Sequence, residues 1–202
     1  MEIVMQLLAA LNSEIDSLPA GFYDTFGYTR TGNNYTHPLT IGILARILSG
    51  IESTGYVLID PHFNDGKAKF QPDIAVVREI NPLEPILYLD YESPNSSDSR
   101  IPVKDVSAYL EWTKETEEKP PYVIITTLPN RKVRKWELRY TAEDKYNHQY
   151  QGQEENIRKN PYDFWYQIYK ASFDKIGLPS IHFINIDGRE ARTVAMGNKR
   201  SA

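Results

Sequence analysis

The sequence predicts an α/β (α+β) fold in which one mixed β-sheet is flanked by helices. Segments with the 3.6-residue apolar repeat of helices alternate with short apolar runs that are typical of buried strands. The predicted order is helix, helix, three strands, helix, two strands, helix and a last strand. A chain of 202 residues is long enough for one well-packed domain, which we expect over residues 1–188, followed by a flexible polar tail over residues 189–202.

The composition limits the class of protein. Hydrophobic residues make up 41% and charged residues 25%, and the lack of cysteine excludes disulfides, thiolate zinc sites and cysteine nucleophiles. No apolar stretch is long enough to cross a membrane and no Lys or Arg precedes Arg30, so we expect no membrane partner, no targeting peptide and a cytoplasmic location. The net charge of −4 argues against non-specific coating of nucleic acid, but it leaves room for a nuclease with a local basic rim.

Two helices are predicted near the N-terminus. Residues 2–18 carry apolar side chains at helical spacing, and Pro19-Ala20-Gly21 ends the pattern. A second helix is expected to begin with Thr36 as its N-cap and Pro38 in its first turn. Its apolar stripe consists of Ile41, Leu44, Ile47, Leu48 and Ile51.

Apolar and β-branched runs predict the strands in the middle of the chain. Three of them are expected over residues 56–60, 67–77 and 85–92. An amphipathic helix over residues 101–118 follows and is ended by Pro120-Pro121. Residues 122–128 are apolar at nearly every position, which favours a central strand that is buried on both faces.

The C-terminal third is less regular. Residues 131–140 are predicted to form a hairpin partner, residues 141–160 an insertion or mobile loop, residues 162–176 a helix and residues 181–186 a last strand. The hairpin carries the main basic patch, which either follows a phosphate backbone or is simply a solvated edge. Its members are Arg131, Lys132, Arg134, Lys135 and Arg139.

Two acidic motifs stand at the ends of predicted strands. Gln71-Pro72-Asp73 leads into Ile-Ala-Val-Val, and Asp90-Tyr91-Glu92-Ser93-Pro94 closes Ile-Leu-Tyr-Leu. Because side chains alternate along a strand, Asp90 and Glu92 should share a face with Ile86 and Tyr88. If the two strands are neighbours, three carboxylates converge at one end of the sheet.

Carboxylates that converge at a buried position are stable together only if a cation neutralises them. Acids on neighbouring strands repel one another unless a positive ion lies between them, and a hard, oxygen-seeking ion such as Mg²⁺ is the natural candidate, with Mn²⁺ as its substitute. Such an ion polarises a scissile phosphate and lowers the pKa of a bound water. The sequence therefore predicts a metal site with Asp73, Asp90 and Glu92 as ligands.

The ordered motifs resemble a known signature. Pro-Asp, a spacer and a strand that ends in an acid are similar to the PD-(D/E)xK nuclease superfamily. Within it the chain resembles the large bacterial family of restriction-endonuclease-like proteins usually called Uma-two, which is abundant in cyanobacteria. The likeness covers about residues 21–128, the expected nuclease core, and leaves residues 129–188 as a divergent C-terminal part. It is carried by Pro72-Asp73, Asp90-Tyr91-Glu92-Ser93-Pro94, Asp98, Lys104, Tyr109 and the upstream His37.

The resemblance implies a restriction-endonuclease-like fold and Mg²⁺-dependent hydrolysis of DNA phosphodiester bonds. Asp73 matches the metal-binding aspartate, Asp90 stands in place of the usual Glu, and Lys104 matches a catalytic lysine that lies on the following helix in this family. Glu92 occupies the strand position where other superfamily members carry Lys. DNA is therefore the expected partner, and a homodimer would suit cleavage of both strands.

Other interpretations stay open. The departures at Asp90 and Glu92 and the acidic net charge fit a nuclease fold whose site has decayed and which acts as a nucleic-acid-binding or assembly module. A small-molecule hydrolase or regulatory domain with a similar acid pair is a third. The four histidines show no metal-ligand spacing, so His37 is interpreted as a structural or helix-start residue rather than a ligand.

Overall fold

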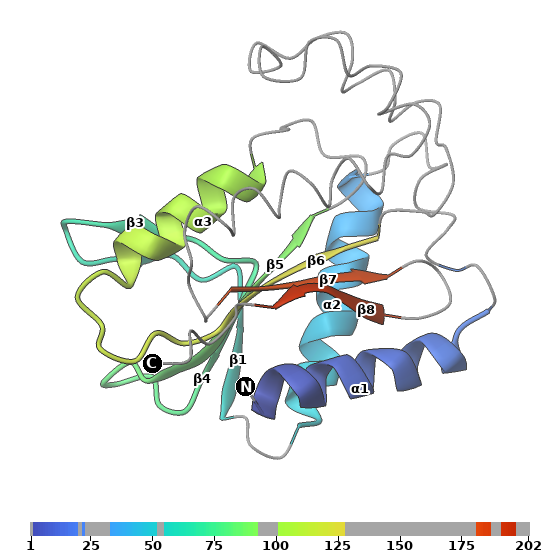
Figure 1. Cartoon of the computed structure of the whole chain (residues 1–202). Helices are drawn as coiled ribbons and strands as arrows, with labels where there is room; N and C mark the ends of the chain where they lie inside the picture. The colour runs from blue at the N-terminus through green and yellow to red at the C-terminus, as the bar shows by residue number, and fades with distance from the viewer. Residues whose placement is uncertain are drawn as a thin grey trace, which may run out of the picture.

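The computed structural model describes residues 2–19, 22, 33–51, 55–92, 101–127, 181–186 and 191–196, with the backbone alone for residues 33–35, 101–104 and 192–196. These residues form a six-stranded sheet, a two-stranded sheet and three helices (Figure 1). The predicted α/β class is thereby confirmed. Within the described residues, no helix has the length and apolar character that spanning a membrane requires.

The large sheet is mixed, with the strand order β1-β4-β5-β6-β7-β8. The first three strands in this order run antiparallel, β5, β6 and β7 run parallel, and β8 pairs antiparallel with β7. Their bounds are Tyr56–Ile59 (β1), Ile74–Val77 (β4), Pro85–Glu92 (β5), Tyr122–Thr126 (β6), Ile181–Ile186 (β7) and Ala191–Met196 (β8). The small sheet consists of β2, Phe63–Asn64, and β3, Lys69–Phe70.

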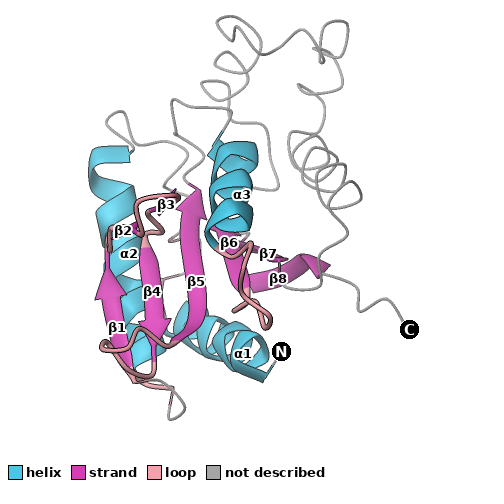
Figure 2. Ribbon diagram, turned by 90° about the vertical axis from the view of Figure 1, so that its left-hand side faces the viewer, coloured by secondary structure: helices cyan, strands magenta, loops and turns pink. Residues whose placement is uncertain are grey.

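Helices cover both faces of the large sheet (Figure 2). Helices α1, Glu2–Ser17, and α2, Asn33–Ser49, pack on one face, whereas α3, Ile101–Trp112, and the small sheet pack on the other. Strand β6 is buried at every position, as expected for a central strand. Two apolar layers therefore enclose the sheet, and any carboxylate that points into either layer is removed from water.

The predicted alternation along β5 holds except at Ile86. Tyr88 faces α3, and Leu87, Leu89 and Tyr91 face α1 and α2. The prediction for Ile86 is wrong, because it packs with the α1 and α2 cluster rather than with Tyr88. The pairing with β4 is irregular at this point, so Ile86 is the unpaired residue of a bulge, which turns its side chain to the other face.

Two predicted elements have different bounds in the structure. Residues 67–77 are not one strand, since β3 and β4 are separated by Gln71-Pro72-Asp73; Pro72 has no N–H to donate to a ladder. The helix predicted over residues 101–118 ends at Trp112, because the acids that follow it are unfavourable at the negative end of a helix dipole. The N-terminal helix, β1, β5, β6 and β7 lie close to their predicted ranges.

Helix α2 begins at Asn33, so Thr36 lies inside the helix and is not its N-cap. The preference of proline for the first helical turn placed the predicted start too late, because Pro38 is instead tolerated within the helix at the loss of one main-chain hydrogen bond. The Thr40 hydroxyl donates to the Thr36 carbonyl at 2.7 Å and satisfies that group within the buried part of the turn.

The expected flexible tail from residue 189 is wrong for residues 191–196, which form β8. The side chain of Asn12 on α1 accepts the Ala191 N–H at 2.7 Å and donates to the Ala191 carbonyl at 3.2 Å. Main-chain pairing with β7 and these hydrogen bonds to Asn12 order residues 191–196 as a strand, although their polar composition predicted a flexible tail. The predicted hairpin over residues 131–140, loop over residues 141–160 and helix over residues 162–176 lie outside the described residues.

His182 makes the protein sensitive to mild acid. It is 2% exposed in β7, its Nδ1 has no hydrogen-bond partner among the described residues, and burial lowers its pKa to about 4. Above pH 6.5 both the folded and the unfolded state keep it neutral. As the pH falls from 6.5 towards 4, only the unfolded state gains the proton, so folding stability is lost.

We predict that His182→Phe flattens this pH dependence. The wild type should lose on the order of 1–2 kcal/mol more than the variant between pH 7 and pH 5, after allowance for solvent screening. Urea unfolding of both proteins at each pH measures the difference. Parallel curves for the two proteins would contradict the assignment, because every other titrating group is common to both.

Candidate acidic site

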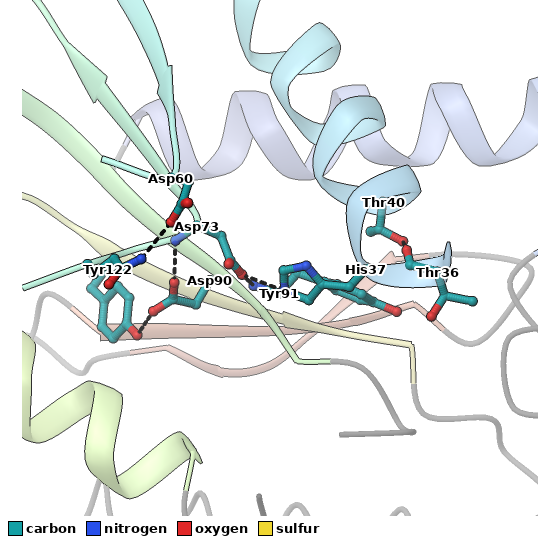
Figure 3. Close-up of polar contacts among 9 residues, drawn as sticks. Thr36, His37, Thr40, Asp60, Asp73, Asp90, Tyr91 and Tyr122 are labelled. Carbon is teal, nitrogen blue, oxygen red and sulfur yellow. Dashed lines mark hydrogen bonds and ion pairs between the residues drawn. The ribbon is translucent and has the colours of Figure 1, made fainter. Parts of the chain in front are cut away.

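Asp73 and Asp90 meet where β4 begins and β5 ends (Figure 3). Asp90 Oδ1 accepts the main-chain N–H of Asp73 at 2.6 Å, and Asp73 Oδ2 accepts the main-chain N–H of Tyr91 at 2.7 Å. Each carboxylate therefore satisfies a backbone donor on the neighbouring segment. The register Ile74↔Leu89 continues outward to this pair, so the two acids that the sequence placed at strand ends are brought side by side.

Asp90 is buried under α3. It is 6% exposed, and its Oδ2 accepts the hydroxyl of Tyr122, which projects from the parallel neighbour β6. Burial raises the pKa of Asp90 well above its ordinary value, and the charges of Asp73 and Asp105 act in the same direction. The Tyr122 hydroxyl and the Asp73 amide oppose this rise, because both donate to the charged form.

Glu92 shares the buried face with Asp90 and meets an acid that the sequence did not single out. It is 8% exposed, and its carboxyl group is hydrogen-bonded to Asp105 on α3. Burial raises the pKa of Glu92 well above its ordinary value, with the charges of Asp105 and Asp90 adding to the effect. Two carboxyl groups can bond in this way only if one of them carries a proton. A lone acid on an amphipathic helix usually faces solvent, so no pattern pointed to Asp105.

His37 lies on the other side of Asp73. Its Nε2 is 3.2 Å from Asp73 Oδ2, and the side chains of the two residues are 31% and 25% exposed. The hydrogen bond to Asp73 raises the pKa of His37, although partial burial works against it. The imidazole also rests on the Tyr91 ring, with centroids 5.6 Å apart. The expectation that His37 is a helix-start residue is wrong, because α2 begins at Asn33, and His37 is instead a partner of the acidic site.

The main chain of Asp73 is fixed separately from its carboxylate. The N–H of Asp60 donates to the Asp73 carbonyl at 2.8 Å, and the Gln71 side chain donates to Asp60 Oδ1 at 2.7 Å. Asp60 has a φ of 51°, a left-handed conformation that Asp tolerates better than most residues. This turn closes the end of β1 against the start of β4 and holds the Asp73 backbone.

Several of the predicted functional residues lie outside the part of the chain that the structure describes. Lys104 lies on α3, one position before Asp105, and its side chain is outside the described residues. Asp98 and the basic patch at residues 131–139 also lie outside them. Comparisons with models of protein families, with curated proteins and with solved structures found no match. These comparisons therefore supply neither a fold nor an activity for the chain.

The donor set suits a hard divalent ion only in part. No group of three or more His, Asp or Glu side chains among the described residues is arranged to ligate one ion. Mg²⁺, however, is commonly held by one or two carboxylates, with water and substrate phosphate completing its shell. Both hydrogen bonds to the Asp73 carboxylate end on Oδ2, and no donor among the described residues reaches Oδ1. Asp90 accepts a hydrogen bond at each of its two oxygens, so of the two acids it is Asp73 that offers an oxygen to an ion.

We predict that Tyr122→Phe raises the pKa of Asp90 further, because the buried carboxylate loses a donor that favours its charged form. Carboxyl ¹³C NMR titration of the metal-free protein measures this change. Tyr109→Phe is the matched control, since Tyr109 stacks on Tyr122 at 4.9 Å but donates to the Pro120 carbonyl. An Asp90 pKa that is unchanged by Tyr122→Phe, or that moves equally in both variants, would contradict the assigned hydrogen bond.

Proposed function

We propose that this protein is a divalent-metal-dependent endonuclease that hydrolyses phosphodiester bonds in DNA, with Asp73 and Asp90 as ligands of Mg²⁺ or Mn²⁺. The observation that carries the proposal is the reciprocal pairing of these two acids through backbone N–H groups at the start of β4 and the end of β5. This pairing presents two carboxylates from adjacent strands in one place, with Glu92 further along the same strand.

The electrostatics of the site support the same conclusion. Burial and mutual repulsion raise the pKa values of Asp90 and Glu92, and no Lys or Arg among the described residues forms an ion pair with either acid. Evolution tolerates such uncompensated acids mainly where they have a task. A bound cation would relieve the repulsion that the apoprotein carries.

The chain's own residues have distinct roles in this proposal. Asp73 and Asp90 hold the ion, Tyr122 orients the Asp90 carboxylate, and Lys104 attends the attacking water, as the resemblance implies. When bound, the ion polarises the phosphate and lowers the pKa of a water molecule. A mixed sheet with helices on both faces is also compatible with the restriction-endonuclease-like architecture that the resemblance implies.

A specific observation favours a second candidate, a nuclease-fold module without catalysis. The Glu92 carboxyl group is hydrogen-bonded to Asp105, and the described residues contain no group of three side chains that could ligate one ion. A site that has lost its ion could persist in this form and serve in nucleic-acid binding or assembly.

The two candidates differ in metal-dependent cleavage. We predict that the wild type cuts DNA with Mg²⁺ or Mn²⁺ and that Asp73→Asn and Asp90→Asn each reduce the rate by more than about 100-fold, since even outer-shell changes at metal sites reach that size. Asp16→Asn, an exposed acid on α1, is the charge-matched control and should cut normally. Gel assays on supercoiled plasmid and on single-stranded DNA measure the rates.

Calorimetric titration with Mn²⁺ separates the outcomes. Binding and cleavage that both disappear in Asp73→Asn support the nuclease. Wild-type protein that neither cuts nor binds Mn²⁺, while remaining folded by circular dichroism, would eliminate the nuclease and leave the non-catalytic module.

A further inference from the structure

We propose that His37 is a positioning residue for Asp73: its Nε2–H fixes one carboxylate oxygen so that the other remains available to the ion. This inference rests on the proposed metal site and extends it to a residue on a different element. The His37 side chain comes from α2, on the face opposite to the helix that covers Asp90 (Figure 3).

The two donors to the Asp73 carboxylate reach the same oxygen. Tyr91 N–H and His37 Nε2 lie 2.7 Å and 3.2 Å from Oδ2. Two donors of different origin, one main-chain and one side-chain, define both the position and the tilt of the carboxylate plane. Oδ1 accepts no hydrogen bond from the part of the chain that the structure describes, and a quarter of the Asp73 side chain is exposed, which leaves this oxygen open to an ion from solvent.

The imidazole is itself held in place. Its ring packs against the Tyr91 ring at a tilt of 46°, and the Tyr91 hydroxyl is hydrogen-bonded to the Thr127 hydroxyl at 2.7 Å in a buried position. The helical turn that carries His37 is stabilised by the hydrogen bond from the Thr40 hydroxyl to the Thr36 carbonyl. A hydrogen bond from a side chain held in this way stabilises Asp73 more than a surface contact would, because the His37 side chain has little conformational freedom left to lose.

No other described side chain performs this task. The turn built by Asp60 and Gln71 fixes the main chain of Asp73 but does not touch its carboxylate. Without His37, the Tyr91 N–H alone would hold the group, and rotation about the Cβ–Cγ bond would become easier. Loss of a hydrogen-bonding partner of a ligating group typically lowers metal affinity by about 10–100-fold.

The test compares three substitutions of His37 by the Mn²⁺ concentration that each variant needs. His37→Gln keeps an N–H donor near the position of Nε2, His37→Asn keeps polarity but is too short to reach, and His37→Ala removes the group. His62→Ala, an exposed histidine on the loop before β2, is the control. Cleavage rates are measured against Mn²⁺ concentration, and the Mn²⁺-induced rise in melting temperature is measured on the same proteins.

We expect His37→Ala and His37→Asn to require about 10–100-fold more Mn²⁺ for half-maximal cleavage, with rates at saturating Mn²⁺ within a few-fold of the wild type. His37→Gln should recover most of the affinity, and His62→Ala should match the wild type. The melting-temperature rise should need the same increase in Mn²⁺ concentration, which a purely structural role for His37 would not produce.

Three results would overturn the inference. Unchanged Mn²⁺ dependence in His37→Ala removes the positioning role while leaving the nuclease intact. His37→Gln as impaired as His37→Ala points to the imidazole as a direct ligand instead. A wild type with neither cleavage nor a Mn²⁺-induced rise in melting temperature removes the proposed function itself, and the role of His37 with it.

Discussion

The exchange of backbone and carboxylate hydrogen bonds between Asp73 and Asp90 is the constraint on which the site depends. Pro72 interrupts the strand and cannot donate, so the following N–H of Asp73 takes the Asp90 side chain as its acceptor. The Tyr91 N–H, which lies beyond Ile74, the first residue of β4, donates to the Asp73 side chain in return. Two carboxylates thus take the place of main-chain acceptors where the ladder between β4 and β5 stops.

This arrangement is costly without a cation. Asp90 and Glu92 are buried on the face of β5 that α3 covers, and the Glu92 carboxyl group is hydrogen-bonded to a second acid, Asp105. Hydrogen bonds from Tyr122 and from the Asp73 amide offset part of the desolvation of Asp90, but neither brings positive charge. Protonation or a bound ion must neutralise the remainder, and this choice links the protonation of the apoprotein to its proposed chemistry.

Sequence patterns predicted the parts of the molecule that depend on local apolar runs. Strand β5 has its predicted bounds, because the apolar run of residues 86–89 follows Pro85 and the polar run after Glu92 ends the strand. The proximity of Asp73 and Asp90 followed from strand ends alone. Strand β8 was missed, since it is stabilised by β7 and by Asn12, which is 179 residues away from Ala191 in the chain. No local signal encodes such contacts.

The same reasoning explains what was missed in the site. His37 and Asp105 lie on two helices that cover opposite faces of the sheet, and both reach the acids only after the layers have packed. The turn of Ile86 to the other face depends on a bulge in the pairing with β4, whereas alternation along one strand assumes regular pairing. Residues of a site that come from neighbouring strand ends can be predicted; those that depend on how helices dock cannot.

The most direct measurement is anomalous diffraction from crystals of the protein soaked in Mn²⁺. We predict a manganese peak at the start of β4 and the end of β5, with carboxylate oxygens of both Asp73 and Asp90 at about 2.1 Å, a distance suited to an ion of this size. A well-ordered site with no manganese between these two acids, or with the ion bound elsewhere, would contradict the central claim.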